Sequence, residues 1–151
     1  MMDNDETISV LNDLIETCKD GEYGFHSSAQ HVKNADLREL FEKRAAQCRQ
    51  SADELRRHVV QLGGNPEDDG SVSGAVHRGW VALRGALSGY SDLAMLEECE
   101  RGEDAALESY TDALQNDLPP AIRTLVMTQY EGVRRNHDQI RNLRDRLKAT
   151  V

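Results

Sequence analysis

The sequence has few aromatic residues, few prolines and no long apolar run, and each shortage excludes a class of protein. Aromatic residues make up 5% of the 151 residues, and two of the three prolines are adjacent. A chain poor in both but rich in Ala, Leu, Glu and Arg is typical of long helices rather than of a β-sheet. Because no stretch approaches ~18 apolar residues, we expect no membrane-spanning segment. The length is that of a single domain, 1–151.

Basic charge and cysteine are also scarce. The formal net charge is −9, which argues against nucleic acid and anionic membranes as partners because both attract basic surfaces. The three cysteines, Cys18, Cys48 and Cys99, form an odd and widely spaced set that makes a poor disulfide framework. The first residues carry neither the basic nor the apolar segment of a secretory signal. We therefore expect a cytoplasmic protein with reduced cysteines in its core.

Apolar residues recur at spacings of three and four, which is the period of an amphipathic helix. The predicted helices cover about 5–33, 36–62, 91–116 and 119–148, joined at 63–90 by a crossover that carries a short extra helix near 75–87. Gly63 and Gly64 end the second helix, and Pro119 and Pro120 open the last. The sequence therefore predicts an all-α four-helix bundle made of two helical hairpins.

The two predicted hairpins are similar in sequence. Residues 15–22 (IETCKDGE) match residues 96–103 (LEECERGE), with Glu, Cys, Gly and Glu identical at a constant shift. Weaker matches between the second and fourth helices have nearly the same shift. An internal duplication explains this agreement better than chance.

Two glutamates interrupt the apolar seams of the first and third helices. Glu22 fills a gap in the first seam, and Glu103 occupies the equivalent position of the repeat. A buried carboxylate is costly unless it is paired, bound to metal or neutralised by a proton. We therefore predict that both are buried and face each other, with a metal, an arginine such as Arg134, or a shared proton between them.

The ferritin-like metal centre uses one glutamate from each of two helices and Glu-x-x-His from each of the other two. Here Glu54 and His58 are one residue too far apart, and Arg134 replaces the glutamate before His137. In one hypothesis, iron or another divalent metal is bound by Glu22, Glu54, His58, Glu103 and His137. In the other, these residues form salt bridges with Arg134, Arg57 and Arg44. We favour the arginine pairing, since the diagnostic motif is broken.

Several stretches resemble a known family. DGEYGF (20–25), SVSGAVHRGW (71–80) and ECERGEDAAL (98–107), together with NHDQIR (136–141), are similar to bacterial ferritin-like four-helix-bundle proteins whose domain has no assigned function. The resemblance implies a ferritin-like bundle and a bacterial cytoplasmic protein. It implies no established activity and transfers no metal ligands.

The leading functional hypothesis is an accessory or stress-type protein whose ferritin-like core binds metal weakly or has lost it. The alternative is a non-enzymatic interaction or structural protein that forms a homodimer, and a third hypothesis is an active di-iron oxidase. The apolar crossover around Trp80 is expected to pack on the bundle or on a partner subunit. No sequence feature indicates a substrate.

Overall fold

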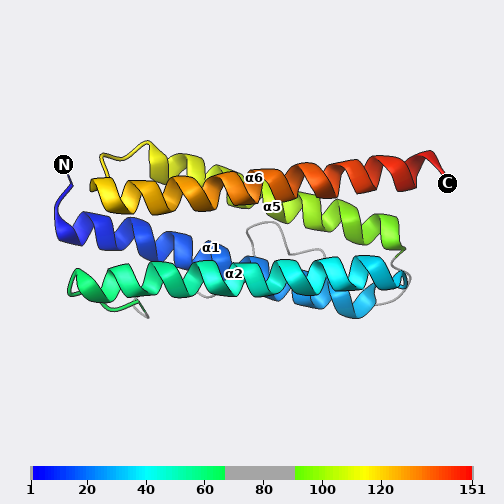
Figure 1. Cartoon of the computed structure of the whole chain (residues 1–151), viewed down its shortest axis with the longest axis horizontal. Helices are drawn as coiled ribbons and strands as arrows, with labels where there is room; N and C mark the ends of the chain where they lie inside the picture. The colour runs from blue at the N-terminus through cyan, green and yellow to red at the C-terminus, as the bar shows by residue number, and fades with distance from the viewer. Residues whose placement is uncertain (1, 67–90, 151) are drawn as a thin grey trace.

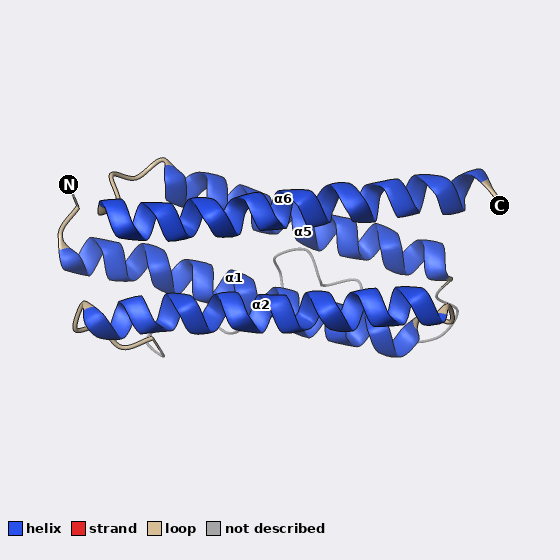
Figure 2. Ribbon diagram, viewed as in Figure 1, coloured by secondary structure: helices blue, strands red, loops and turns tan. Residues whose placement is uncertain are grey.

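The structure, a computed structural model, describes residues 2–66 and 91–150 and consists there of four α-helices (Figures 1 and 2). They are α1 (Asn4–His31), α2 (Ala35–Gln61), α5 (Asp92–Leu114) and α6 (Pro120–Ala149), and no strand occurs in these two ranges. The all-α prediction is confirmed, with helix ends within a few residues of those expected. The predicted helix near 75–87 and Trp80 lie outside the described residues.

Three of the four described helices begin after a residue whose side chain caps the first turn, and the fourth begins at a proline. Asp3, Asn34 and Ser91 cap α1, α2 and α5, each accepting a hydrogen bond from a backbone N–H in the first turn. Pro120 is the first residue of α6, where proline removes no helical hydrogen bond. After α2, Gly63 takes a φ of +86°, a left-handed conformation that glycine adopts without strain.

The four helices form two antiparallel hairpins that pack through α1 and α5 (Figure 1). Within the hairpins α1 pairs with α2 and α5 with α6, whereas α2 and α6 approach each other much less closely. In Figure 1, α2 and α6 lie nearer the viewer than α1 and α5. The end of α2 and the beginning of α5 lie at opposite ends of the bundle, as a crossover connection requires.

The core consists of two apolar clusters, one toward each end of the bundle. One is built around Leu11, Leu55 and Val126, and the other around Phe41 and Met95. Most apolar residues at the helical spacing belong to these clusters, for example Ile15, Phe25, Ala45 and Tyr110, so the helical period identified most of the buried faces correctly. The part of α2 between the clusters contains buried Arg44 and half-buried polar residues, and the candidate site lies at this level.

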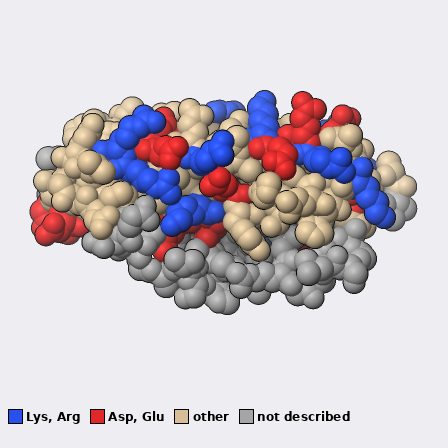
Figure 3. All heavy atoms as spheres, turned by 90° about the horizontal axis from the view of Figure 1, so that it is seen from below, with Lys and Arg blue, Asp and Glu red and all other residues tan. Residues whose placement is uncertain are grey.

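None of the described helices is both long and apolar enough to span a membrane. The face of the molecule seen in Figure 3 carries basic and acidic side chains interspersed, with no broad patch of one sign.

Candidate functional site

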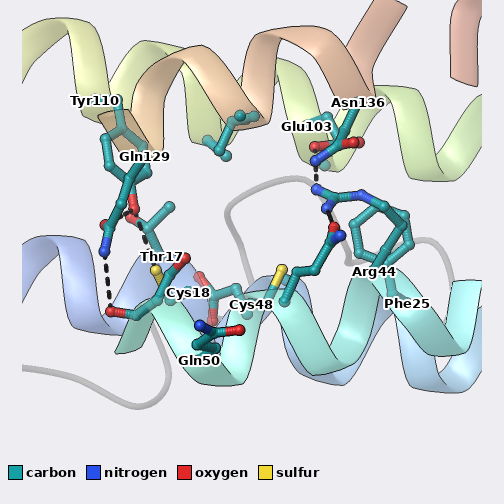
Figure 4. A pocket seen from close by; sticks show the side chains of 18 of the residues that line it. Thr17, Cys18, Phe25, Arg44, Cys48, Gln50, Glu103, Tyr110, Gln129 and Asn136 are labelled. Carbon is teal, nitrogen blue, oxygen red and sulfur yellow. Dashed lines mark hydrogen bonds and ion pairs between the residues drawn. The ribbon is translucent and has the colours of Figure 1, made fainter. Parts of the chain in front are cut away.

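A cavity of about 310 Å³ lies at mid-height, with walls contributed by all four helices (Figure 4). Polar and apolar side chains both line it. Those used below come from α1 (Asp20, Gly21, Phe25), α2 (Arg44, Gln47, Cys48, Glu54), α5 (Gly102, Glu103, Ala106, Tyr110) and α6 (Gln129, Gly132, Val133, Arg135). Gln50 of α2 and Arg135 of α6 line the cavity and are exposed to solvent, so the cavity opens between these two helices.

Glycines from three helices meet at this cavity: Gly21, Gly102 and Gly132. Gly21 makes room for a thiol, because a Cβ atom there would lie 2.7 Å from Cys48 Sγ. Gly132 differs, since the nearest atom that a Cβ there would meet among the described residues is Arg135 Nη2, at 3.8 Å. A glycine inside a helix costs roughly 1 kcal/mol relative to alanine. The three glycines therefore leave room at the cavity but make the helices less stable than alanine would.

A buried ion pair forms one end of the cavity. Arg44 of α2 donates to Glu103 Oε2 of α5 at 3.2 Å, and the two side chains are 5% and 3% exposed. Arg44 also donates to Gln47 and lies over the ring of Phe25, 5.3 Å from its centroid. These contacts fix the guanidinium group in the core and join the two hairpins across the cavity (Figure 4).

Arg44 compensates Glu103 incompletely. Burial raises the pKa of Glu103 to about 7, and the nearby Arg44 and His137 oppose this rise. Glu103 Oε1 is buried and has no hydrogen-bond partner within the described ranges. A carboxyl group in this state is poised between the charged and neutral forms near neutral pH.

A chain of hydrogen bonds forms the other end of the cavity. The Tyr110 hydroxyl donates to Gln129 Oε1 at 2.7 Å, and Gln129 Nε2 donates to Glu54 Oε1 at 3.2 Å and to Ser51 O at 3.3 Å. Cys18 Sγ lies 3.3 Å from the same hydroxyl. Burial raises the pKa of Tyr110 well above its ordinary value, so the phenol stays neutral and remains the donor to Gln129.

The three cysteines are free, as predicted, and Cys18 and Cys99 are buried. Burial raises the pKa of Cys18 to about 11 and raises those of Cys48 and Cys99 further. Because the thiolate is the reactive form, these side chains are poor nucleophiles at neutral pH. A catalytic cysteine at this site is therefore disfavoured.

The prediction that Glu22 is buried opposite Glu103 is wrong. Glu22 is 38% exposed, and its Oε2 lies 4.0 Å from Nη1 of Arg49, itself 64% exposed. The neighbouring residue Gly21, rather than Glu22, faces inward at this level of α1 and lines the cavity beside Cys48. The two repeat-equivalent glutamates therefore differ, since one is in the core and the other is hydrated.

The predicted charge partner also changes. Glu103 is paired with an arginine, but not with Arg134 of α6, which is exposed. Its partner is Arg44 of α2, one of the three arginines that the salt-bridge hypothesis named. The pairing crosses between the hairpins, and residue spacing within one helix cannot reveal it.

The remaining predicted ligands face separate partners. His137 Nε2 lies 2.6 Å from Asp104 Oδ1 and 3.8 Å from Glu100 Oε2, and Arg144 donates to Glu100. His58 is half-buried near the end of α2. Over residues 2–66 and 91–150, no three His, Cys, Asp or Glu side chains are grouped so that they could hold a metal ion. Metal binding by the five predicted residues stays a prediction that would require them to move.

Sequence reasoning missed Gln129 and Gly132 as parts of the site. A signal for both was present in the chain. Gln129 lies three residues after Val126 and four before Val133, so it is a polar residue at a seam position. Gly132 is a glycine in the middle of a long helix, which usually has a packing or functional reason.

The chain has the features of the ferritin-like class of four-helix bundles. It consists of two antiparallel hairpins, the connection between them joins opposite ends of the bundle, and polar side chains lie at mid-height. Within that class the chain belongs to the family described as Domain of unknown function (DUF2383), which matches residues 6–116. This confirms the resemblance seen in the sequence. No curated protein matches the chain significantly in sequence.

Solved structures with the same fold include Dps proteins from two organisms. Dps from Staphylococcus aureus aligns with a TM-score of 0.78 and 19% identity, covering 95% of this chain and 97% of that one. The tetragonal form of Mycobacterium smegmatis Dps aligns with a TM-score of 0.74 and 15% identity, covering 92% of this chain and 86% of that one. A point mutant of Mycobacterium smegmatis Dps1 aligns with a TM-score of 0.74 and 16% identity, covering 94% of this chain and 98% of that one. At these identities the likeness establishes the fold.

Proposed function

We propose that this protein is a ferritin-like accessory or stress-type protein that works without a di-metal centre and acts by binding rather than by catalysis. One observation carries the proposal, namely the ion pair between Arg44 and Glu103 in the middle of the bundle. In metal-binding bundles of this class, inward carboxylates at mid-height need metal cations. Here a guanidinium group supplies the positive charge from within the chain.

The other polar groups at mid-height support the same proposal. Gln129 holds Glu54 through an amide, and Asp104 and Glu100 surround His137, so these side chains already have protein partners. The thiols have raised pKa values and are poor metal ligands while protonated. A binding or scaffolding role needs none of them to react.

Metal analysis tests this proposal. The purified protein is incubated with Fe²⁺ or Zn²⁺, desalted and assayed for bound metal, and its thermal midpoint is measured with and without EDTA. We expect no stoichiometric metal and no change in midpoint, because a chelator has nothing to remove. Retention of one or two ions per chain, with a midpoint that falls in EDTA, would refute the proposal.

A second candidate is weak metal binding, and the raised pKa of Glu103 favours it. A carboxyl group that Arg44 compensates incompletely could accept a divalent ion if Arg44 moved aside. Iron or another divalent metal would then be held by some of Glu22, Glu54, His58, Glu103 and His137. Glu103→Gln and His137→Gln should each abolish metal retention in this case, and oxygen uptake with Fe²⁺ would identify a di-iron oxidase.

We further propose that the chain forms a homodimer. The support is the apolar composition of residues 75–87, which contain Trp80 and exceed what a solvated connection needs. Light scattering on the wild type and on Trp80→Ala tests this point. A dimeric mass that is reduced in the variant is expected, and a monomeric wild type would contradict the proposal.

A further inference from the structure

We infer that the cavity between α2 and α6 binds a small organic ammonium ion, that is, a protonated primary amine carrying a short apolar chain. This inference goes beyond the proposed function, which would stand even if the cavity took no ligand. It rests on the charge of the walls, on hydrogen-bond acceptors left over there, and on the space kept beside apolar side chains.

The described residues that line the cavity include more acidic than basic side chains. Three carboxylate residues, Asp20, Glu54 and Glu103, line the cavity together with two arginines, Arg44 and Arg135. Arg135 is exposed at the opening, whereas Arg44 is held inside by Glu103 and Gln47. In surroundings shielded from water, an excess of carboxylate favours a cation. The net charge of −9 on the whole chain attracts cations as well.

The acceptors at the two ends of the cavity are incompletely used. Glu54 is hydrogen-bonded to the amide of Gln129, and none of the described cations forms a salt bridge with it. Glu103 is 3% exposed, yet its Oε1 has no partner in the described part of the chain. An ammonium group carries three donors and no acceptor, which suits such sites. Arg44 Nε also lacks a partner there, but an anion bound to it would have to compete with Glu103.

The rest of the wall suits a short hydrocarbon chain. Phe25, Ala106 and Val133 are apolar lining residues, and Gly132 leaves its side of the cavity open. A volume of about 310 Å³ is at the small end of ligand sites, which span roughly 300–1,000 Å³. The cavity therefore fits an alkylamine of a few carbon atoms rather than a large cofactor.

The test is a calorimetric titration of the full chain, in metal-free buffer near neutral pH, with three probes of equal length: n-butylammonium, n-butyramide and n-butyrate. We expect n-butylammonium to bind with a Kd of about 1 mM or tighter. It should also raise the thermal midpoint as ligand is added, because it binds the folded state. The neutral and anionic probes should bind at least tenfold more weakly. Equal binding of all three, or no binding of n-butylammonium, overturns the inference.

Three variants locate the binding. Glu54→Gln should weaken n-butylammonium at least tenfold, and Gly132→Leu should abolish binding by filling the cavity. Glu39→Gln is the matched control, since Glu39 is an exposed acid of the same helix that does not line the cavity, and it should leave the affinity unchanged. Circular dichroism checks that each variant folds, and if Glu54→Gln does not, Gly132→Leu decides. Unchanged affinity in the folded cavity variants places binding elsewhere and overturns the inference.

Discussion

The buried pair of Arg44 and Glu103 can be compared directly with the pair of Arg49 and Glu22, because the two glutamates are equivalent in the repeat. The first pair is almost fully buried, whereas both members of the second are more than a third exposed. Removing one member of a buried pair leaves an uncompensated charge, whereas an exposed pair is screened by water. The exposed pair therefore serves as a control for the effect of burial on the contribution of the buried pair to stability.

For this reason Arg44→Met should destabilise the fold by about 3 kcal/mol at alkaline pH. The loss should be smaller in mild acid, because Glu103 then carries a proton and needs no counterion. Arg49→Met should cost less than about 1 kcal/mol at either pH. Urea denaturation of both variants measures the difference. Equal losses for the two arginines would show that the buried pair has no special role.

A second residue-scale prediction concerns the contact between Gly21 and Cys48. Gly21→Ala should destabilise by about 1–3 kcal/mol, since the added methyl group would overlap the thiol. In a Cys48→Ala background the same change should be neutral or stabilising, because the sulfur is gone and alanine favours a helix. A double-mutant cycle measures the coupling. Additive effects would mean that the thiol simply moves aside.

At the scale of the helices, the regular parts of the fold were predictable and the pairing across the cavity was not. The apolar spacing in α1 and α2, together with Gly63 after α2 and Pro120 at the start of α6, indicated the correct helices. A small rotation of α1 decides whether Gly21 or Glu22 faces inward, and the helical period does not resolve such a rotation. Which arginine reaches Glu103 depends on packing between hairpins.

Helix α6 provides a prediction at this scale, because Gly132 lies in its interior beside the cavity. Gly132→Ala should stabilise the fold by about 0.5–1 kcal/mol, since the methyl group would make only an ordinary contact with Arg135 among the described residues and alanine restricts the unfolded chain. Thermal or urea unfolding measures the gain. A loss of stability would show that the space beside Gly132 is smaller than the structure indicates.

At the scale of the whole molecule, opposite charges face each other within the second hairpin. Helix α5 contains eight carboxylate residues and one arginine, whereas α6 contains seven Lys or Arg residues and three carboxylates. Arg144 with Glu100, and His137 with Asp104, join the two helices. Because α6 carries much of the basic charge of an acidic chain, charge complementarity as well as apolar contact holds α5 and α6 together.

The pH dependence of stability should carry the signature of Glu103. Its pKa is about 7 in the fold and near 4.5 when unfolded, so between these values the folded state binds more protons. Its contribution therefore makes the protein less stable as the pH rises from 4.5 to 7, by at most about 1.4 kcal/mol per pH unit. Glu103→Gln should flatten this part of a urea-unfolding profile. An identical profile in the variant would show that Glu103 does not titrate there.

The central claim is that Arg44, and not a metal ion, compensates Glu103 in the middle of the bundle. The most direct test is a crystal structure of the protein grown with Mn²⁺, with anomalous scattering recorded to locate the metal. We predict no anomalous peak beside Glu103 and an intact contact between Arg44 and Glu103. An anomalous peak coordinated by Glu103, with Arg44 displaced from the core, would contradict the account.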